Sequence, residues 1–210
     1  MKIKICGLTD TNNISDIMDL NPDYIGFIFY PASPRYMEDK LFPEDLSPLS
    51  PGTKKTGVFV DSDFHEVSGK YGKYNLDVVQ LHGEESPELC KQLNASGIEI
   101  IKAFRINDEF DFHTITGYMP YCRYFLFDTY TRLKGGSGKK FNWKVINSYD
   151  LGHPFFLSGG ISPLDADEIT GITNPSLKGV DLNSRFEDSP GIKNIAKLKK
   201  FIEELRGQEI

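Results

Sequence analysis

Asp128 is the residue whose type and position suggest chemistry most directly. Four aromatic or aliphatic residues, Tyr124 to Phe127, precede it, and a loop with three glycines and four basic residues follows. A carboxylate is costly to bury in such surroundings without a partner or a purpose. Two interpretations stay open: Asp128 caps a helix or pairs with a loop lysine, or it acts as a general acid at the end of a strand.

Cys6 is the second candidate, because it ends the apolar run Ile3–Cys6 and is followed by Gly7. A small cysteine with apolar neighbours is usually an inert part of the core. At a strand end, however, a thiolate stabilised by nearby cations can abstract a proton. Cys90 lies within a predicted helix and Cys122 precedes a predicted strand, so we interpret both as structural.

Two further residues follow other apolar runs. Arg35 stands in "YPASPRY" and is either a solvated loop charge or a planar fork that binds a carboxylate or phosphate. His82 stands in "QLHGEE", two residues after Gln80. It either forms a hydrogen bond within the core or supports a site.

The elements that must position these residues are short apolar runs, eight in all. Most are dense in Val, Ile, Phe and Leu, as expected of strands that are buried on both faces. The predicted strands are Ile3–Cys6, Tyr24–Phe29, Lys55–Val60, Asp77–Leu81, Glu99–Ala103, Tyr124–Phe127, Phe155–Leu157 and Leu177–Leu182.

Helical segments separate the predicted strands. Ser86-Pro87 has the residue types of an N-cap and a first helical position, and Ser162-Pro163 repeats them. Prolines at 48 and 51 shorten the segment after the second strand, and Gly69 and Gly72 interrupt the segment after the third. The other predicted helices are Asn12–Leu20, one that begins at Trp143, and one near Asn194–Leu205.

Eight strands alternating with helices predict an α/β fold, a closed (β/α)₈ TIM barrel. With 210 residues it would be compact, since such barrels typically have about 250 residues and rarely fewer than about 200. An open doubly wound sheet is the alternative. No linker or low-complexity tract divides the sequence, so residues 1–210 are predicted to form a single domain.

A barrel of this kind carries its site at the carboxyl ends of its strands, where all the candidates above fall. Gly159 and Gly160 follow the seventh strand and let backbone N–H groups approach an anion. Asp181, Asn183 and Ser184 end the eighth strand. Paired glycines alone indicate a tight turn, but after strand seven of eight they favour a phosphate site.

The composition limits the partners. A net charge of −6 argues against a protein that coats nucleic acid or anionic membranes. Three widely spaced cysteines provide neither a disulfide framework nor a zinc spacing. The first residues are too short a segment for a signal peptide, and no run approaches the ~20 apolar residues of a membrane helix. We expect a cytoplasmic protein, a monomer or homodimer, with a small-molecule partner.

Five blocks of the sequence resemble the phosphoribosylanthranilate isomerase family. They are "KICGLT" at 4–9, "GFIFYPASPRY" at 26–36, "VQLHGEE" at 79–85, "GGSGKKFNW" at 135–143 and "LSGGISP" at 157–163. The resemblance implies a (β/α)₈ barrel of tryptophan biosynthesis with no metal or organic cofactor. It implies an Amadori rearrangement of N-(5-phosphoribosyl)anthranilate to 1-(2-carboxyphenylamino)-1-deoxyribulose 5-phosphate.

The resemblance also implies roles for particular residues. Cys6 would be the general base, Asp128 the general acid, and Arg35 the residue that holds the anthranilate carboxylate. The phosphate loops would be Gly159-Gly160 and Asn183-Ser184. Asp128 would protonate the ribose ring oxygen and Cys6 would remove the C2′ proton. The glycine-rich loop after Asp128 would cover the substrate.

One segment departs from the family pattern. Arg185 stands where the family commonly has glycine, and we predict that it adds a contact to the phosphate.

Three rival functions stay open. The first is the sugar-phosphate isomerase of histidine biosynthesis, whose barrel has an aspartate in each half, whereas this chain has Cys6 on its first strand. The second is a phosphosugar-binding barrel that needs neither Cys6 nor Asp128. The third is a cysteine hydrolase in which His82 activates the thiol.

Overall fold

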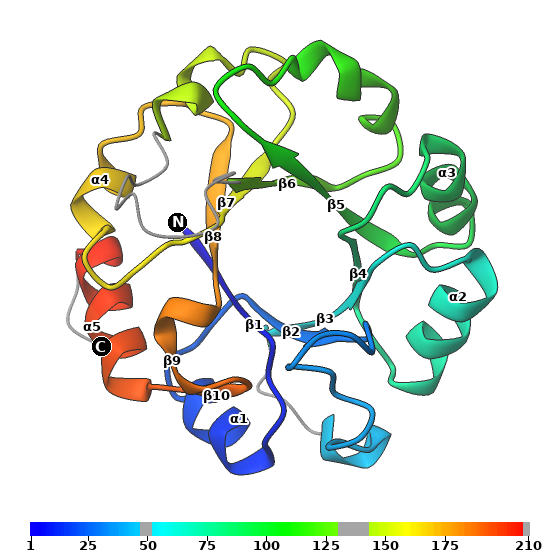
Figure 1. Cartoon of the computed structure of the whole chain (residues 1–210), viewed down its shortest axis with the longest axis vertical. Coiled ribbons are helices and arrows are strands. Elements are labelled where there is room, and N and C mark those ends of the chain that lie inside the picture. Colours follow the sequence, from blue (N-terminus) through cyan, green and yellow to red (C-terminus); the bar gives the residue numbers. More distant parts are fainter. Residues whose placement is uncertain (47–51, 130–142, 208–210) are drawn as a thin grey trace.

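The structure is a computed structural model that describes residues 1–46, 52–129 and 143–207. Its centre is a closed barrel of eight parallel strands, with the helices arranged around it (Figure 1). The strands are β1 (Lys2–Cys6), β2 (Tyr24–Ile28), β3 (Lys54–Phe59), β4 (Val78–Leu81), β5 (Glu99–Ile106), β6 (Tyr124–Thr129), β7 (Phe155–Ser158) and β8 (Leu177–Leu182). Because β1 pairs with both β2 and β8, the sheet is closed and the predicted (β/α)₈ barrel is confirmed.

Five α-helices and four 3₁₀ helices lie between or after the strands within the described residues. The α-helices are α1 (Thr11–Met18), α2 (Phe64–Lys73), α3 (Pro87–Ala95), α4 (Ala166–Thr170) and α5 (Ile195–Arg206). The 3₁₀ helices are Pro43–Leu46, Phe112–Tyr118, Trp143–Ser148 and Ser184–Phe186. A hairpin of β9 (Glu187–Ser189) and β10 (Ile192–Lys193) precedes α5. The described parts of the connections after β2, β5 and β6 contain only 3₁₀ turns, which helps 210 residues to close a barrel.

Two of the predicted helix features have different outcomes. Ser86 caps α3 as predicted, since its Oγ accepts the N–H of Leu89. The predicted helix start at Ser162-Pro163 is wrong, because α4 begins at Ala166. The carboxylate of Asp165 accepts the Ser162 N–H at 2.8 Å, and the Asp165 N–H donates to the Ser162 carbonyl. These two bonds fold residues 162–165 into a turn.

The predicted interruption at Gly69 and Gly72 is also wrong. Helix α2 runs unbroken through both glycines, after Asp63, whose side chain accepts the N–H of Glu66. Val67 is fully buried and fixes the helix against the core. A cap and a buried anchor outweigh the ~1 kcal/mol that each exposed glycine costs.

No described helix is long and apolar enough to cross a bilayer.

The alternation of side chains along β6 explains how the barrel positions its polar residues. Phe125 and Phe127 pack in the large cluster between strands and helices, whereas Tyr124 and Leu126 belong to a separate buried cluster inside the barrel. Side chains two residues apart point to the same face of a strand. Asp128 therefore continues the inward series and reaches the mouth of the barrel.

Candidate active site

A cavity of about 280 Å³ opens at the carboxyl ends of the strands. Of the nine predicted site residues, eight line it, namely Cys6, His82, Asp128, Gly159, Gly160, Asp181, Asn183 and Ser184. Five residues that were not predicted as site residues complete the wall, namely Ile28, Val58, Gln80, Ser158 and Ile161. The barrel therefore brings together residues from seven strands or strand ends that are far apart in the sequence.

Cys6 lies on the buried side of this cavity, next to Lys4. A Cβ added to Gly26 would lie 2.7 Å from the Cys6 sulfur and 3.2 Å from the Lys4 ammonium, so both groups meet over this glycine. Burial raises the pKa of the Cys6 thiol above its ordinary value, and the Lys4 cation counteracts this only in part. The predicted thiol at the barrel mouth is thus present, with a cation beside it.

Lys4 is fully buried and held by Asp181. Its Nζ lies 2.8 Å from Asp181 Oδ1, and Ser158 Oγ lies 3.5 Å from Asp181 Oδ2. Burial by itself lowers the pKa of Lys4, but Asp181 and Cys6 outweigh it and hold that pKa above its ordinary value. Lys4 is therefore a cation, and Asp181 is engaged by it. A direct contact of Asp181 with substrate stays a prediction.

Asp128 faces His82 in the more open part of the cavity. Their side chains are 30% and 22% exposed, and His82 Nε2 lies 3.1 Å from Asp128 Oδ2. The other ring nitrogen, Nδ1, lies 2.8 Å from Gln80 Nε2. Because this amide nitrogen only donates, Nδ1 accepts, and the proton on Nε2 is donated to Asp128. His82 serves Asp128, whereas the rival hydrolase would need it at Cys6.

Arg35 lies at the edge of the site, beside the turn that follows β1. Gly7 has φ +79°, and a Cβ there would lie 2.7 Å from Arg35 Cδ and 2.9 Å from Asn183 Oδ1. Only glycine allows both the left-handed backbone and this close approach. The guanidinium of Arg35 forms a two-pronged ion pair with Glu187, through Nε at 2.8 Å and Nη2 at 2.6 Å. The fork predicted to bind a carboxylate thus binds one of the protein's own.

The part of the cavity wall that follows β7 has the backbone expected of an anion site. Gly159 and Gly160 have φ values of +90° and +69°, and an added Cβ on Gly160 would meet nothing within 4 Å. Asn183 and Ser184 line the same cavity. Arg185 is exposed and is not part of the cavity lining. The predicted glycine-rich cover, residues 130–142, lies outside the described residues.

Three charged residues near the site were not predicted. Lys4 had a detectable signal, because a lysine two positions before Cys6 in a buried strand must share its face. Glu187 and Lys193 had none, since they come from the β9–β10 hairpin. Glu187 reaches Arg35 only through the closed barrel, and Lys193 contacts Glu187. Among the described residues, no group of three or more metal-ligating side chains is present.

Fold and site together define a (β/α)₈-barrel enzyme whose active site lies at the carboxyl ends of its strands. The family model of N-(5'phosphoribosyl)anthranilate (PRA) isomerase matches residues 3–204. The N-(5'-phosphoribosyl)anthranilate isomerase of Parabacteroides distasonis is 44% identical over 208 residues, which cover 98% of this chain and 93% of that one.

Solved structures agree with the sequence relatives. Phosphoribosyl anthranilate isomerase from Thermotoga maritima matches with a TM-score of 0.83 and 33% identity over 99% of both chains. A phosphoribosyl anthranilate isomerase in complex with reduced 1-(o-carboxyphenylamino)-1-deoxyribulose 5-phosphate matches with a TM-score of 0.80 and 30% identity, again over 99% of both chains. The chain belongs to the phosphoribosylanthranilate isomerase family, and it is an isomerase of tryptophan biosynthesis.

Proposed function

We propose that this chain converts N-(5-phosphoribosyl)anthranilate to 1-(2-carboxyphenylamino)-1-deoxyribulose 5-phosphate with Asp128 as general acid and Cys6 as general base. The supporting observation is that these two side chains line one cavity while coming from β6 and β1, which lie on opposite sides of the barrel in Figure 1. An acid and a base on different sides of a bound sugar are what the rearrangement requires.

The proposed reaction has two proton transfers. Asp128 donates a proton to the ribose ring oxygen, and the C1′–O bond breaks to give a Schiff base. The thiolate of Cys6 then takes the C2′ proton, and the electron pair of that C–H bond forms the enolamine, which tautomerises to the aminoketone. His82 Nε2–H stabilises the carboxylate that Asp128 becomes, and the Lys4 cation stabilises the thiolate before it reacts.

The two charged ends of the substrate have separate supports in this proposal. The left-handed glycines 159 and 160, with Asn183 and Ser184, form the phosphate end. Arg35 serves the carboxylate end, next to Gly7. Holding both ends fixes C2′ between acid and base, which supplies much of the rate enhancement of such reactions. Single-domain organisation, cytoplasmic location and a monomeric or homodimeric state stay predictions.

A fluorescence assay tests the proposal. N-(5-phosphoribosyl)anthranilate, made in situ, is followed as wild type, Cys6→Ser or Asp128→Asn is added. We expect rapid loss of the signal with wild type and rates lower by about 10²–10⁴-fold with each variant, the usual contribution of a general acid or base. A folded wild type without turnover would reject the function and direct the assay to the histidine-pathway substrate. Turnover that survives Asp128→Asn would reject the mechanism.

A further inference from the structure

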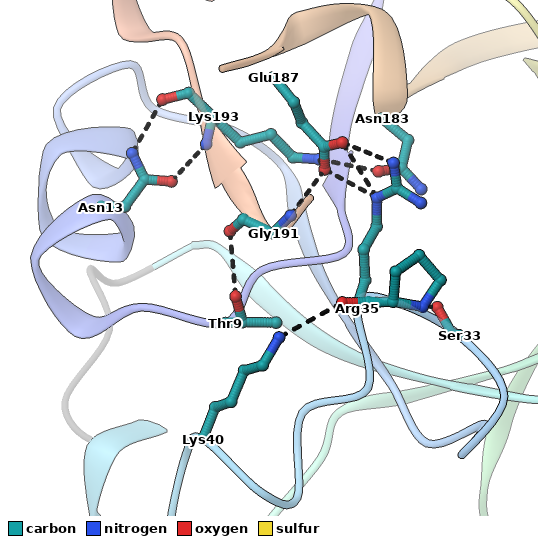
Figure 2. A network of polar contacts seen from close by, with 10 residues as sticks. Thr9, Asn13, Ser33, Arg35, Lys40, Asn183, Glu187, Gly191 and Lys193 are labelled. Carbon is teal, nitrogen blue, oxygen red and sulfur yellow. Dashed lines mark hydrogen bonds and ion pairs between the residues drawn. The ribbon is translucent and has the colours of Figure 1, made fainter. Parts of the chain in front are cut away.

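A cluster of three charged side chains, buried at Lys193 and Glu187 and partly exposed at Arg35, lies beside the cavity (Figure 2). Arg35 and Lys193 both contact Glu187, with Arg35 Nη2 2.6 Å from Oε2 and Lys193 Nζ 2.6 Å from Oε1. The side chains of Lys193, Glu187 and Arg35 are 0%, 5% and 18% exposed. Two cations and one carboxylate leave the cluster with one excess positive charge. A buried excess charge is costly unless an anion neutralises it.

Glu187 is held in place without the help of Arg35. Besides the Lys193 ammonium, its Oε1 accepts the N–H of Gly191 at 3.2 Å. The hairpin that carries it is fixed to α1, because the Asn13 amide exchanges two hydrogen bonds with the Lys193 backbone, at 2.7 and 2.9 Å. Thr9 Oγ1 lies 3.3 Å from the Gly191 carbonyl. Glu187 is therefore a fixed acceptor against which the Arg35 side chain is oriented.

The contact with Glu187 uses only one edge of the Arg35 guanidinium. Of the five N–H donors, those of Nε and one of Nη2 point to the Glu187 carboxylate. Within the described part of the chain, Nη1 donates no hydrogen bond. The edge formed by Nη1 and the second Nη2 proton is thus left for another planar acceptor. A carboxylate matches this edge with two parallel hydrogen bonds.

Lys193 connects the same cluster to the cavity wall. Its Nζ lies 2.8 Å from Oδ1 of Asn183, a residue that lines the cavity. Arg35 packs against the turn at Gly7, directly after Cys6. The excess charge and the unused edge therefore lie at the rim of the active site.

We propose that Glu187 and Lys193 are a positioning pair, which orients Arg35 so that its Nη1 edge binds the aryl carboxylate of the substrate. The inference rests on the proposed function. The alternative is that Glu187 competes with the substrate, because its carboxylate would occupy the place on Arg35 where the substrate carboxylate binds. The independent anchors of Glu187 and the net positive charge of the cluster both support positioning.

Two stable ligands test this inference. One is reduced 1-(2-carboxyphenylamino)-1-deoxyribulose 5-phosphate, and the other is the same molecule without the carboxyl group. For Glu187→Gln we expect the carboxylated ligand to bind about tenfold more weakly and the other to change less than about twofold, because misorientation affects only the group that Arg35 contacts. In an Arg35→Met background, Glu187→Gln should have no further effect on the carboxylated ligand. Glu99→Gln is the control, since Glu99 pairs with Lys54 at the start of β5.

Each alternative result overturns the inference. If Glu187→Gln binds the carboxylated ligand as tightly as wild type or more tightly, Glu187 is a bystander or a competitor. If both ligands weaken equally, the role of Glu187 is structural. Should Glu187→Gln fail to fold, Glu187→Asp keeps the charge but shortens the reach, and the same ratio of the two ligands decides. Wild-type turnover in the fluorescence assay separates failure of this inference from failure of the proposed function.

Discussion

The charged and titratable groups on the two sides of the cavity differ in their exposure to water. On the β1–β8 side, Cys6, Lys4 and Asp181 are 3%, 0% and 6% exposed, and the cation and carboxylate neutralise each other inside the protein. On the β4–β6 side, His82 and Asp128 are 22% and 30% exposed at the side chain. Electrostatic interactions are far stronger on the dry side, because water does not screen them there.

The difference fits the two proposed tasks. The base must take a proton from carbon, and a desolvated thiolate whose pKa is raised is a strong base once it forms. The acid must be reprotonated in every cycle, which contact with water makes simple. The comparison predicts that ionic substitutions on the dry side affect stability and base strength, whereas those on the open side affect the rate alone.

The largest effect is expected for Lys4→Met. Removing one partner of a buried ion pair leaves the Asp181 carboxylate uncompensated, and such losses are about 3–5 kcal/mol. Urea unfolding followed by circular dichroism would measure the change in free energy. The control is Lys54→Met, whose half-exposed pair with Glu99 should contribute less than about 1 kcal/mol.

The double variant Lys4→Met/Asp181→Leu sharpens this first prediction. Removing both charges takes away the uncompensated carboxylate, so the double variant should be more stable than Lys4→Met alone. If Lys4→Met alone is as stable as wild type, Lys4 and Asp181 are not a buried ion pair whose two charges depend on each other.

The second prediction concerns pH. Because the folded protein raises the pKa of the Cys6 thiol, the thiolate forms only as pH rises, and kcat/KM should increase towards alkaline pH. Lys4 lowers that pKa, so in Lys4→Met the rising limb should move to higher pH. Initial rates across neutral and alkaline pH would measure it. A limb that is absent, or that moves to lower pH, contradicts the assignment of Cys6 as base.

The linked effect on stability has the opposite sign. A thiol whose folded pKa is raised contributes stability below its unfolded pKa, and this contribution is lost as pH rises through the folded value. Cys6→Ala should therefore lose less stability on alkalinisation than wild type. Thermal melts at matched pH values would show whether the two curves converge.

His82→Gln should have a smaller effect, confined to the open side. It weakens a partly exposed hydrogen bond to Asp128 that contributes about 1 kcal/mol, so we expect kcat to fall about fivefold. Steady-state rates measure this, and the rate of Cys6 alkylation should stay at the wild-type value. A loss as large as that of Asp128→Asn would mean that His82 itself transfers a proton.

The smallest effect is expected for Arg185→Gly, which tests the predicted phosphate contact. Arg185 is exposed, so its charge should contribute less than about 1 kcal/mol, and KM should rise about threefold. The increase should shrink at high salt, since screening weakens exposed charges first. An unchanged or lower KM would show that Arg185 is not a phosphate ligand.

Much of the site was predictable because strands impose a fixed alternation. The apolar run before Asp128 predicted a buried strand, and the spacing of two from Leu126 explains why the carboxylate faces inward. The start of α4 was not predictable in the same way. Ser162-Pro163 has the residue types of a helix start, yet the Asp165 carboxylate binds the Ser162 N–H and delays the helix.

The sequence alone determined the eight strands of the barrel, the barrel itself and eight of the thirteen residues that line the cavity, because hydrophobic runs, strand alternation and strand ends are local properties. Only the tertiary structure decided which charges meet. Lys4 reaches Asp181 across 177 residues and Arg35 reaches Glu187 across 152. Such pairs depend on barrel closure, since β8 returns beside β1 only when the sheet closes. Local sequence therefore placed the candidate acid and base, and closure selected the ions that surround them.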